Sequence, residues 1–135
     1  MGANVGHRGR ALARLRDALA RDGVSIDRAS SEILTRPVGV TAQEDFHNQV
    51  VRLRSGEPWA PEHWLAHCKA AEVAAGRRET YRWGPRRADA DILLLGEHGE
   101  VAVDTPELTV PHRELPNRPF WGRLLREIDA PRTEF

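Results

Sequence analysis

The spacing of apolar residues along the chain predicts three amphipathic helices. In the first, apolar residues recur at every third or fourth position with arginines between them, and Asp22-Gly23 ends the pattern. The second begins with a Trp-Ala-Pro-Glu segment, in which Pro61 suits the first helical position. The third is expected to direct its apolar residues, Trp121 among them, toward the core. The expected helices span Arg8–Asp22, Trp59–Gly76 and Phe120–Ile128.

Between these helices, alternating apolar and polar residues predict β-strands. The first is expected to enter a long loop that ends at Phe46, and the second to pair with Val24–Ser31 of the first. A run of four apolar residues bounded by Gly96 is typical of a buried strand. Glycines at both ends of Gly96–Gly99 predict a hairpin turn and then a return strand. The expected strands span Val24–Thr35, Asn48–Arg54, Ile92–Leu95 and Val101–Val103.

Composition narrows the class of protein. The 135 residues are expected to form one domain, residues 1–135, which is large enough to bury a hydrophobic core. A net charge of zero with 30% charged residues makes nucleic acid an unexpected partner. Cys68 is the single cysteine, which excludes an internal disulfide and suits a reducing compartment. Because no apolar run is long enough for a signal peptide or a membrane span, we expect a cytoplasmic protein with no membrane partner, and we take it to be a monomer.

Two aspartates lie one residue apart beside the expected buried strand. If that strand begins near Asp89, its period of two directs the side chains of Asp89 and Asp91 to the same face, with their backbones about 6.6 Å apart. Magnesium is commonly held by one or two carboxylates together with substrate phosphates, and nearby arginines can bind phosphate oxygens bidentately. A D-x-D pair alone is weak support for this chemistry, because acids often flank a strand and bind nothing.

A second candidate for metal binding lies in the second expected helix. His63 and His67 are separated by one helical turn, a spacing that can bind zinc. No third ligand is evident in the sequence, so a solvated helix face is the favoured interpretation of this pair. Phe46 has the same ambiguity, because a single aromatic residue is more often a core residue than a binding residue.

The string from Arg82 to Leu95, RWGPRRADADILLL, is far more specific than a pair of aspartates. It resembles the signature of the 6-hydroxymethyl-7,8-dihydropterin pyrophosphokinase family, whose pattern is close to RWGPRxxDxDIL. The matching residues are Arg82, Trp83, Gly84, Pro85, Arg86, Asp89, Asp91, Ile92 and Leu93. Other motifs of the family follow in the family's order at Gly2–Val5, Thr35–Gly39, Phe46–Asn48, Glu72–Arg77, Leu108–His112 and Asn117–Phe120.

This resemblance implies a fold and a reaction. The implied fold is α+β, a ferredoxin-like antiparallel sheet flanked by helices. The implied reaction is the transfer of pyrophosphate from ATP to 6-hydroxymethyl-7,8-dihydropterin in folate biosynthesis, with a pair of Mg²⁺ ions as cofactors. ATP and the dihydropterin are therefore the expected small-molecule partners.

The resemblance also implies roles for individual side chains. The expected pterin-binding residues are Thr35, Val38, Phe46, Asn48 and Phe120, with the two phenylalanine rings on opposite faces of the pterin. The expected ATP-binding residues are Glu72, Trp83, Arg86, Ile92, Thr109, His112 and Arg118. The expected magnesium ligands are Asp89 and Asp91, and the expected catalytic residues are Arg77, Arg86 and His112.

Two of the departures of the sequence from the family pattern bear on the fold. Only Met1 stands where the family has the apolar residues of its first strand, so this strand is expected to be missing or truncated. Ala88 and Ala90 replace larger apolar residues, which is expected to loosen the packing behind the acids. These departures leave open an inactive relative that binds pterin or nucleotide. A structural partner domain without a ligand is a further alternative, which the many polar motif residues disfavour.

Overall fold

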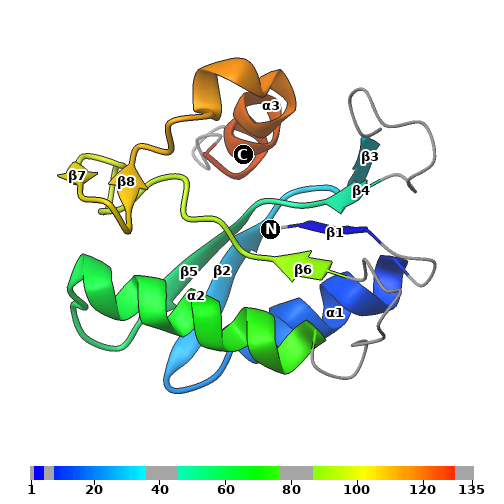
Figure 1. Cartoon of the computed structure of the whole chain (residues 1–135), viewed down its shortest axis with the longest axis horizontal. Coiled ribbons are helices and arrows are strands. Elements are labelled where there is room, and N and C mark those ends of the chain that lie inside the picture. Colours follow the sequence, from blue (N-terminus) through cyan, green and yellow to red (C-terminus); the bar gives the residue numbers. More distant parts are fainter. Residues whose placement is uncertain (1, 5–7, 36–45, 77–86, 130–135) are drawn as a thin grey trace, which may run out of the picture.

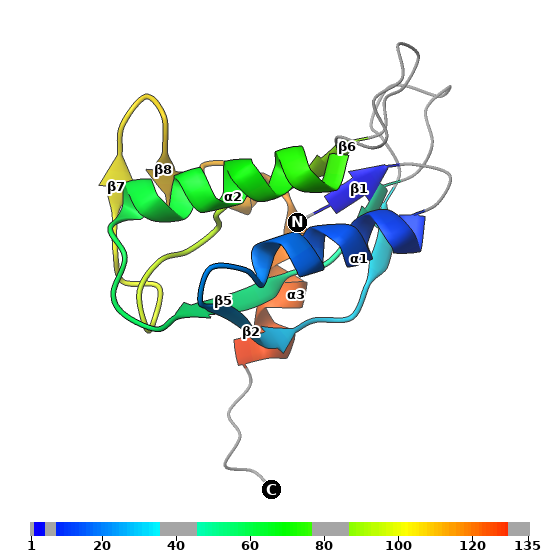
Figure 2. The ribbon, with the colours of Figure 1, turned by 90° about the horizontal axis from the view of Figure 1, so that it is seen from below.

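The computed structural model of the chain describes residues 2–4, 8–35, 46–76 and 87–129. Within these residues the fold is α+β, with small antiparallel sheets and three α-helices. Two of the helices, α1 (Arg8–Leu19) and α2 (Pro61–Gly76), lie side by side on one face of the sheets. The third helix, α3 (Pro119–Asp129), covers the opposite face (Figure 1, Figure 2). Within the described residues, this layered arrangement places a hydrophobic core on each side of the strands.

The three predicted helices are confirmed, with their ends shifted by a few residues. The first helix ends at Leu19 rather than Asp22, because Asp22 and Gly23 adopt positive φ angles of 58° and 82° that a right-handed helix does not use. A single 3-10 turn, η2 (Leu115–Asn117), precedes α3. The strands are β1 (Gly2–Asn4), β2 (Val24–Ala29), β3 (Ile33–Thr35), β4 (Phe46–Asn48), β5 (Val51–Ser55), β6 (Arg87–Asp89), β7 (Val103–Asp104) and β8 (Thr109–Val110).

The central sheet has four antiparallel strands in the order β3-β4-β1-β6. The strand β1 lies between β4 and β6, so the prediction of a missing or truncated first strand is not confirmed. The hairpin predicted from the alternating pattern is present, because β2 pairs with β5 as expected. The first predicted strand, however, is divided into β2 and β3, and β4 lies mostly before the second predicted strand, at the end of the expected loop. The strands β3 and β4 belong to the central sheet.

The prediction of a buried strand at Ile92–Leu95 is wrong. The strand β6 ends at Asp89, and the run that follows is not assigned to any strand. Its backbone carbonyls accept hydrogen bonds from more distant segments instead of a neighbouring ladder, as His112 N–H donates to Leu93 O at 3.0 Å. The turn at Gly96–Gly99 is confirmed by a 3.3 Å backbone hydrogen bond, but the return strand is limited to β7, which pairs with β8.

The core on the α1/α2 side is built from small side chains. Its buried residues are Leu15, Ala18, Leu19, Cys68, Ala71, Ala75, Ala88 and Ala90. Because α2 and β6 both present alanines here, helix and strand can approach closely. Burial raises the pKa of the Cys68 thiol to about 11, so this thiol stays protonated near neutral pH. The core on the α3 side consists of Val50, Leu93, Leu124 and Ile128, and partly buried apolar side chains, Trp121 among them, pack around it.

The two histidines of α2 do not share a solvated face. His67 is buried, and its Nε2 lies 2.8 Å from the carbonyl oxygen of Leu19 at the end of α1. His63 is exposed and stacks on Trp59, with ring centroids 3.8 Å apart. The expected solvated face is therefore wrong for His67, which instead joins α2 to α1. In the described part of the chain, none of the helices combines the length and the apolar character needed to cross a membrane.

Candidate active site

A row of paired residues crosses the central sheet and connects two of the predicted binding sites. Gly2 of β1 is paired with Asn48 of β4 on one side and with Asp89 of β6 on the other. Directly paired residues of antiparallel strands direct their side chains to the same face, and two strand spacings separate Asn48 from Asp89 by about 10 Å. Glycine has no side chain, so the row contributes an amide and a carboxylate to one face of the sheet.

The alternation of buried and accessible residues in β6 shows toward which helices the Asp89 side chain is directed. Ala88 and Ala90 are 7% and 8% exposed and belong to the core on the α1/α2 side. Asp89 and Asp91 alternate with them and are more accessible, while Leu93, two residues further on, packs into the core on the α3 side. Asp89, the last residue of β6, therefore lies on the α3 side of the strand, as the alternation of the sequence predicted, and Asp91 follows the strand as an exposed residue.

Glu72 of α2 supports the segment that carries the two aspartates. Its Oε2 accepts a 2.7 Å hydrogen bond from the backbone N–H of Ala90, which lies between Asp89 and Asp91. Its Oε1 lies 3.5 Å from the ammonium group of Lys69. The predicted contact of Glu72 with ATP stays a prediction, and in the structure its carboxylate holds the backbone of the acidic segment against α2.

His112 is held in a defined orientation on the loop after β8. The ring Nδ1 of His112 accepts a 3.1 Å hydrogen bond from the backbone N–H of Glu114. The backbone N–H of His112 donates to the carbonyl oxygen of Leu93. Because Nδ1 acts as an acceptor, the neutral imidazole carries its hydrogen on Nε2. The ring can therefore donate a hydrogen bond from Nε2 to an anionic oxygen.

Trp121 brings three of the predicted ligand-binding residues together. The imidazole of His112 meets its ring edge-on, with centroids 5.0 Å apart and an interplanar angle of 82°. The guanidinium carbon of Arg118 lies 5.3 Å from the centroid of the ring, and the ring of Phe120 lies 5.9 Å away. The sequence predicted Trp121 only as a core residue, because a helical spacing identifies a buried face but not the polar groups that share it.

The remaining predicted site residues are only partly located. Thr35 pairs with Phe46 across β3 and β4, and Thr109 of β8 pairs with Asp104. Ile92 packs against the core on the α1/α2 side, so only its backbone is available to a ligand on the α3 side. The predicted residues that lie outside the described part of the chain are Val38, Arg77, Trp83 and Arg86.

The two aspartates fit a magnesium site better than a transition-metal site. In the described residues, no group of three or more His, Cys, Asp or Glu side chains could hold a metal without help from a ligand. A pair of exposed or half-exposed carboxylates close together in the chain is a donor set that Mg²⁺ uses when substrate phosphates complete its shell. Asp89 and Asp91 would hold such an ion.

Comparison with known protein families identifies the chemistry to which this arrangement belongs. Residues 1–130 match the family of 7,8-dihydro-6-hydroxymethylpterin-pyrophosphokinase. The chain belongs to this pyrophosphokinase family. The match spans every element of the fold described above, from β1 to α3. The resemblance predicted from the motifs is therefore confirmed.

Individual relatives within the pyrophosphokinase family cover most of the chain. The 2-amino-4-hydroxy-6-hydroxymethyldihydropteridine pyrophosphokinase of Bacillus subtilis is 34% identical over 132 residues, which cover 95% of this chain and 74% of that protein. The Aquifex aeolicus protein of the same name is 31% identical over 129 residues, 96% of this chain and 77% of that protein.

Plant relatives place the same region in a longer protein. The mitochondrial folate synthesis bifunctional protein of Pisum sativum is 36% identical over 120 residues, 89% of this chain. The matched region is 22% of the pea protein and 21% of an Arabidopsis thaliana relative, so this chain spans about a fifth of the length of these plant relatives.

Proposed function

We propose that this chain transfers pyrophosphate from ATP to 6-hydroxymethyl-7,8-dihydropterin, in folate biosynthesis. The observation that carries the proposal is the row Asn48–Gly2–Asp89 on the α3 side of the sheet. This row places a candidate pterin-binding amide and a candidate metal-binding carboxylate about 10 Å apart, with glycine between them. Bacterial relatives that carry the name pyrophosphokinase, matched over nearly the whole chain, support the same reaction.

The reaction needs positioning more than covalent chemistry. The hydroxymethyl oxygen attacks the β-phosphorus of ATP, the bond from this phosphorus to the bridging oxygen of the α-phosphate breaks, and AMP leaves while the hydroxyl proton is released. Asn48 would bind the edge of the pterin, and Phe46 and Phe120 its faces. Correct orientation of the two reactants can lower the barrier by about 7 kcal/mol or more.

The charge that develops during transfer requires cationic and hydrogen-bonding groups. His112 would donate from Nε2 to a phosphate oxygen, because its Nδ1 is occupied by the N–H of Glu114. Arg118 would bind phosphate from its place over Trp121, and Arg77 and Arg86 would add further positive charge. Mg²⁺ held by Asp89 and Asp91, as a pair of ions in the proposed complex, would neutralise phosphate charge.

The proposal includes the finer description of the fold and its setting. The strand order β3-β4-β1-β6, with α1 after β1 and α2 before β6, supports a ferredoxin-like arrangement. The proposed active unit is a monomer. A single unpaired cysteine, Cys68, is compatible with the cytoplasm as its compartment.

The test is to measure the products of ATP in the presence of the dihydropterin. We expect AMP in amounts equal to the pyrophosphorylated pterin, and only when Mg²⁺ is present. Asp89→Ala is expected to lower kcat by at least about a hundredfold, because electrostatic stabilisation of the transferred group is lost. Pterin affinity should change much less, because Asn48 and the aromatic residues remain.

Asp104→Ala is the matched control. Asp104 is an exposed aspartate of β7, on a separate two-stranded sheet, and its loss should leave the rate within about twofold. An active Asp89→Ala variant would overturn the metal assignment. Release of ADP instead of AMP, or no pterin-dependent product from the unmodified chain, would overturn the proposed reaction.

A further inference from the structure

The long hairpin of the protein bends where it passes from one sheet to the other. Its inner part is the ladder of β2 with β5, and its outer part is the ladder of β3 with β4. Three residues, Ser30–Glu32, separate the ladders on one strand, and two residues, Gln49 and Val50, separate them on the other. Such an unequal count interrupts a ladder and bends the strands, as a β-bulge does.

One backbone hydrogen bond and two side-chain hydrogen bonds hold the two strands together at this bend. Ser30 N–H donates to Val50 O at 2.8 Å, and the Val50 N–H donates to the hydroxyl of Ser30 at 2.9 Å. The amide nitrogen of Gln49 donates to Ser30 O at 2.7 Å. Ser30 and Gln49 are both buried, so these bonds satisfy polar groups that water cannot reach. The bend is therefore a built feature with a defined geometry.

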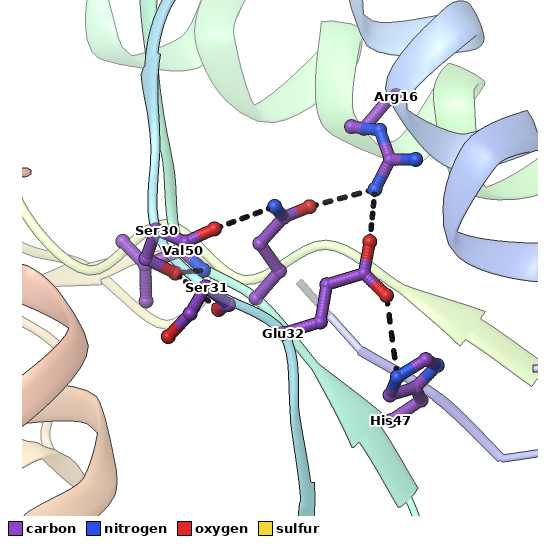
Figure 3. A network of polar contacts seen from close by, with 7 residues as sticks. Arg16, Ser30, Ser31, Glu32, His47 and Val50 are labelled. Carbon is purple, nitrogen blue, oxygen red and sulfur yellow. Dashed lines mark hydrogen bonds and ion pairs between the residues drawn. The ribbon is translucent and has the colours of Figure 1, made fainter. Parts of the chain in front are cut away.

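A chain of charged contacts extends from this bend to α1 and β4 (Figure 3). Arg16 of α1 donates from the same nitrogen to Gln49 Oε1 at 2.8 Å and to Glu32 Oε2 at 3.1 Å. The other carboxylate oxygen of Glu32 lies 3.2 Å from Nε2 of His47 in β4. Because a carboxylate accepts, this contact places the imidazole hydrogen on Nε2. We call Arg16, Glu32 and His47 the charged clamp.

The charged clamp lies on the side of the sheet opposite the proposed active site. His47 pairs with Ala3, and Ala3 pairs with Ala88, which faces the α1/α2 core. Asn48, the next residue of β4, pairs with Gly2 and belongs to the row that faces α3. Neighbouring residues of a strand face opposite sides, so the clamp stands directly behind Asn48 and does not reach a substrate bound on the α3 side.

We propose that the charged clamp positions Asn48 for the pterin. This inference rests on the proposed function. Strand β4 is only three residues long, and Asn48 is its last residue, next to the bend. β4 is paired with β1 on one side and with β3 on the other, and the contact of His47 with Glu32, which Arg16 anchors, adds a side-chain bond beside Asn48. Arg16, Glu32 and His47 are positioning residues for pterin binding, and they take no part in the binding of ATP.

The test compares substrate constants in variants of the clamp. Glu32→Ala and His47→Leu each remove the contact that holds β4, and we expect a rise in KM for the dihydropterin of about 5- to 20-fold, the size of one charge-assisted hydrogen bond. The KM for ATP and the kcat should each change less than about twofold, because the proposed ATP-binding and metal-binding residues do not lie on β4. His47→Gln keeps an N–H that can reach Glu32 and should recover most of the pterin affinity.

Asp27→Asn is the matched control on the same hairpin. Asp27 lies 3.3 Å from both Arg52 and Arg54, on the inner ladder, with side-chain exposure close to that of Glu32. Its replacement should leave the KM for the dihydropterin unchanged. Should Glu32→Ala fail to fold, Arg16→Lys carries the test, because a single ammonium group cannot reproduce the planar donor that contacts Gln49 and Glu32 together.

The possible results separate the two proposals. An unchanged KM for the dihydropterin in the clamp variants would overturn the inference, as would a parallel loss of kcat, ATP affinity and thermal stability, which would indicate a merely structural network. If the unmodified chain forms no AMP, the proposed function fails first, and the inference fails with it. A selective rise in the KM for the dihydropterin, reversed in His47→Gln, would support the positioning role.

Discussion

At the scale of single residues, Glu72 determines how firmly the two aspartates are held. The substitution Glu72→Ala removes the carboxylate and leaves the buried N–H of Ala90 without this acceptor. This loss lowers the free energy of unfolding by about 1–3 kcal/mol. We expect a lower melting temperature and a higher Mg²⁺ concentration for half-maximal AMP formation. Both are measured in one series of thermal scans and magnesium titrations.

Two further variants separate this positioning role from a direct contact with ATP. Glu72→Gln keeps an oxygen that can accept from Ala90 and should retain most of the activity. Lys69→Ala removes only the exposed partner at 3.5 Å, a surface ion pair worth at most about 1 kcal/mol. If Glu72→Gln is as impaired as Glu72→Ala, the negative charge itself is needed and the positioning account of Glu72 is wrong.

Trp121 gives a second prediction at this scale. Its ring contacts the imidazole of His112 and the guanidinium of Arg118, interactions worth about 0.5–1.5 and 0.5–1 kcal/mol respectively. Trp121→Leu should therefore lower kcat/KM for ATP by about tenfold, whereas Trp121→Phe, which keeps a ring, should lose much less. Trp64→Leu is the control, since Trp64 lies on α2 across the sheet (Figure 1). Equal losses in Trp121→Leu and Trp64→Leu would contradict the assignment.

At the scale of elements, the helices could be predicted and the strands only in part. A helix is recognised from its own apolar spacing, and the three predicted helices were found with small shifts at their ends. The strands β7 and β8 have two residues each and exist only because they pair with one another. Their formation depends on non-local partners, which a pattern along the chain does not contain. The same reason explains why Ile92–Leu95 was wrongly predicted as a strand.

The attachment of α3 to the hairpin gives a prediction about pH. Glu127 of α3 accepts hydrogen bonds from the N–H of Ser31 at 2.8 Å and from its hydroxyl at 2.9 Å. The backbone bond first and the hydroxyl second hold the pKa of Glu127 below its usual value of 4.5, so the ionised carboxylate stabilises the fold more than the protonated carboxyl does. The contribution of Glu127 to stability is fully present at pH values above the usual pKa of 4.5. It is lost as the pH falls through the lowered pKa of the folded state.

Thermal scans of Glu127→Gln against pH test this attachment. We expect a lower melting temperature than that of the unmodified chain at pH 7, and a difference that shrinks as the pH falls below about 4.5. Glu107→Gln makes the same charge change at an exposed turn residue and should show a much smaller difference at every pH. If the melting temperature of Glu127→Gln stays below that of the unmodified chain by the same amount down to pH 2, the role of the ionised carboxylate is contradicted.

At the scale of the whole molecule, the sequence predicts candidate site residues but not the contacts that support them. The motifs that resemble the family point to Asn48, Asp89 and His112 as candidates, because the residues of such motifs are spaced by the demands of the substrates. The contacts that hold these residues could not be predicted in the same way. The bond of Glu72 to Ala90 and the contact of His47 with Glu32 join segments far apart in sequence, and they depend on how closely small side chains let the elements approach.

The face of the sheet toward α3 is proposed to hold both substrates. A crystal structure with 6-hydroxymethylpterin, a non-hydrolysable ATP analogue and Mn²⁺ tests this proposal, because anomalous scattering locates the metal. We expect Mn²⁺ bound to Asp89 and Asp91, the pterin beside Asn48, and Gly2 between them. A metal bound away from the two aspartates, or a pterin on the α1/α2 side, would contradict it.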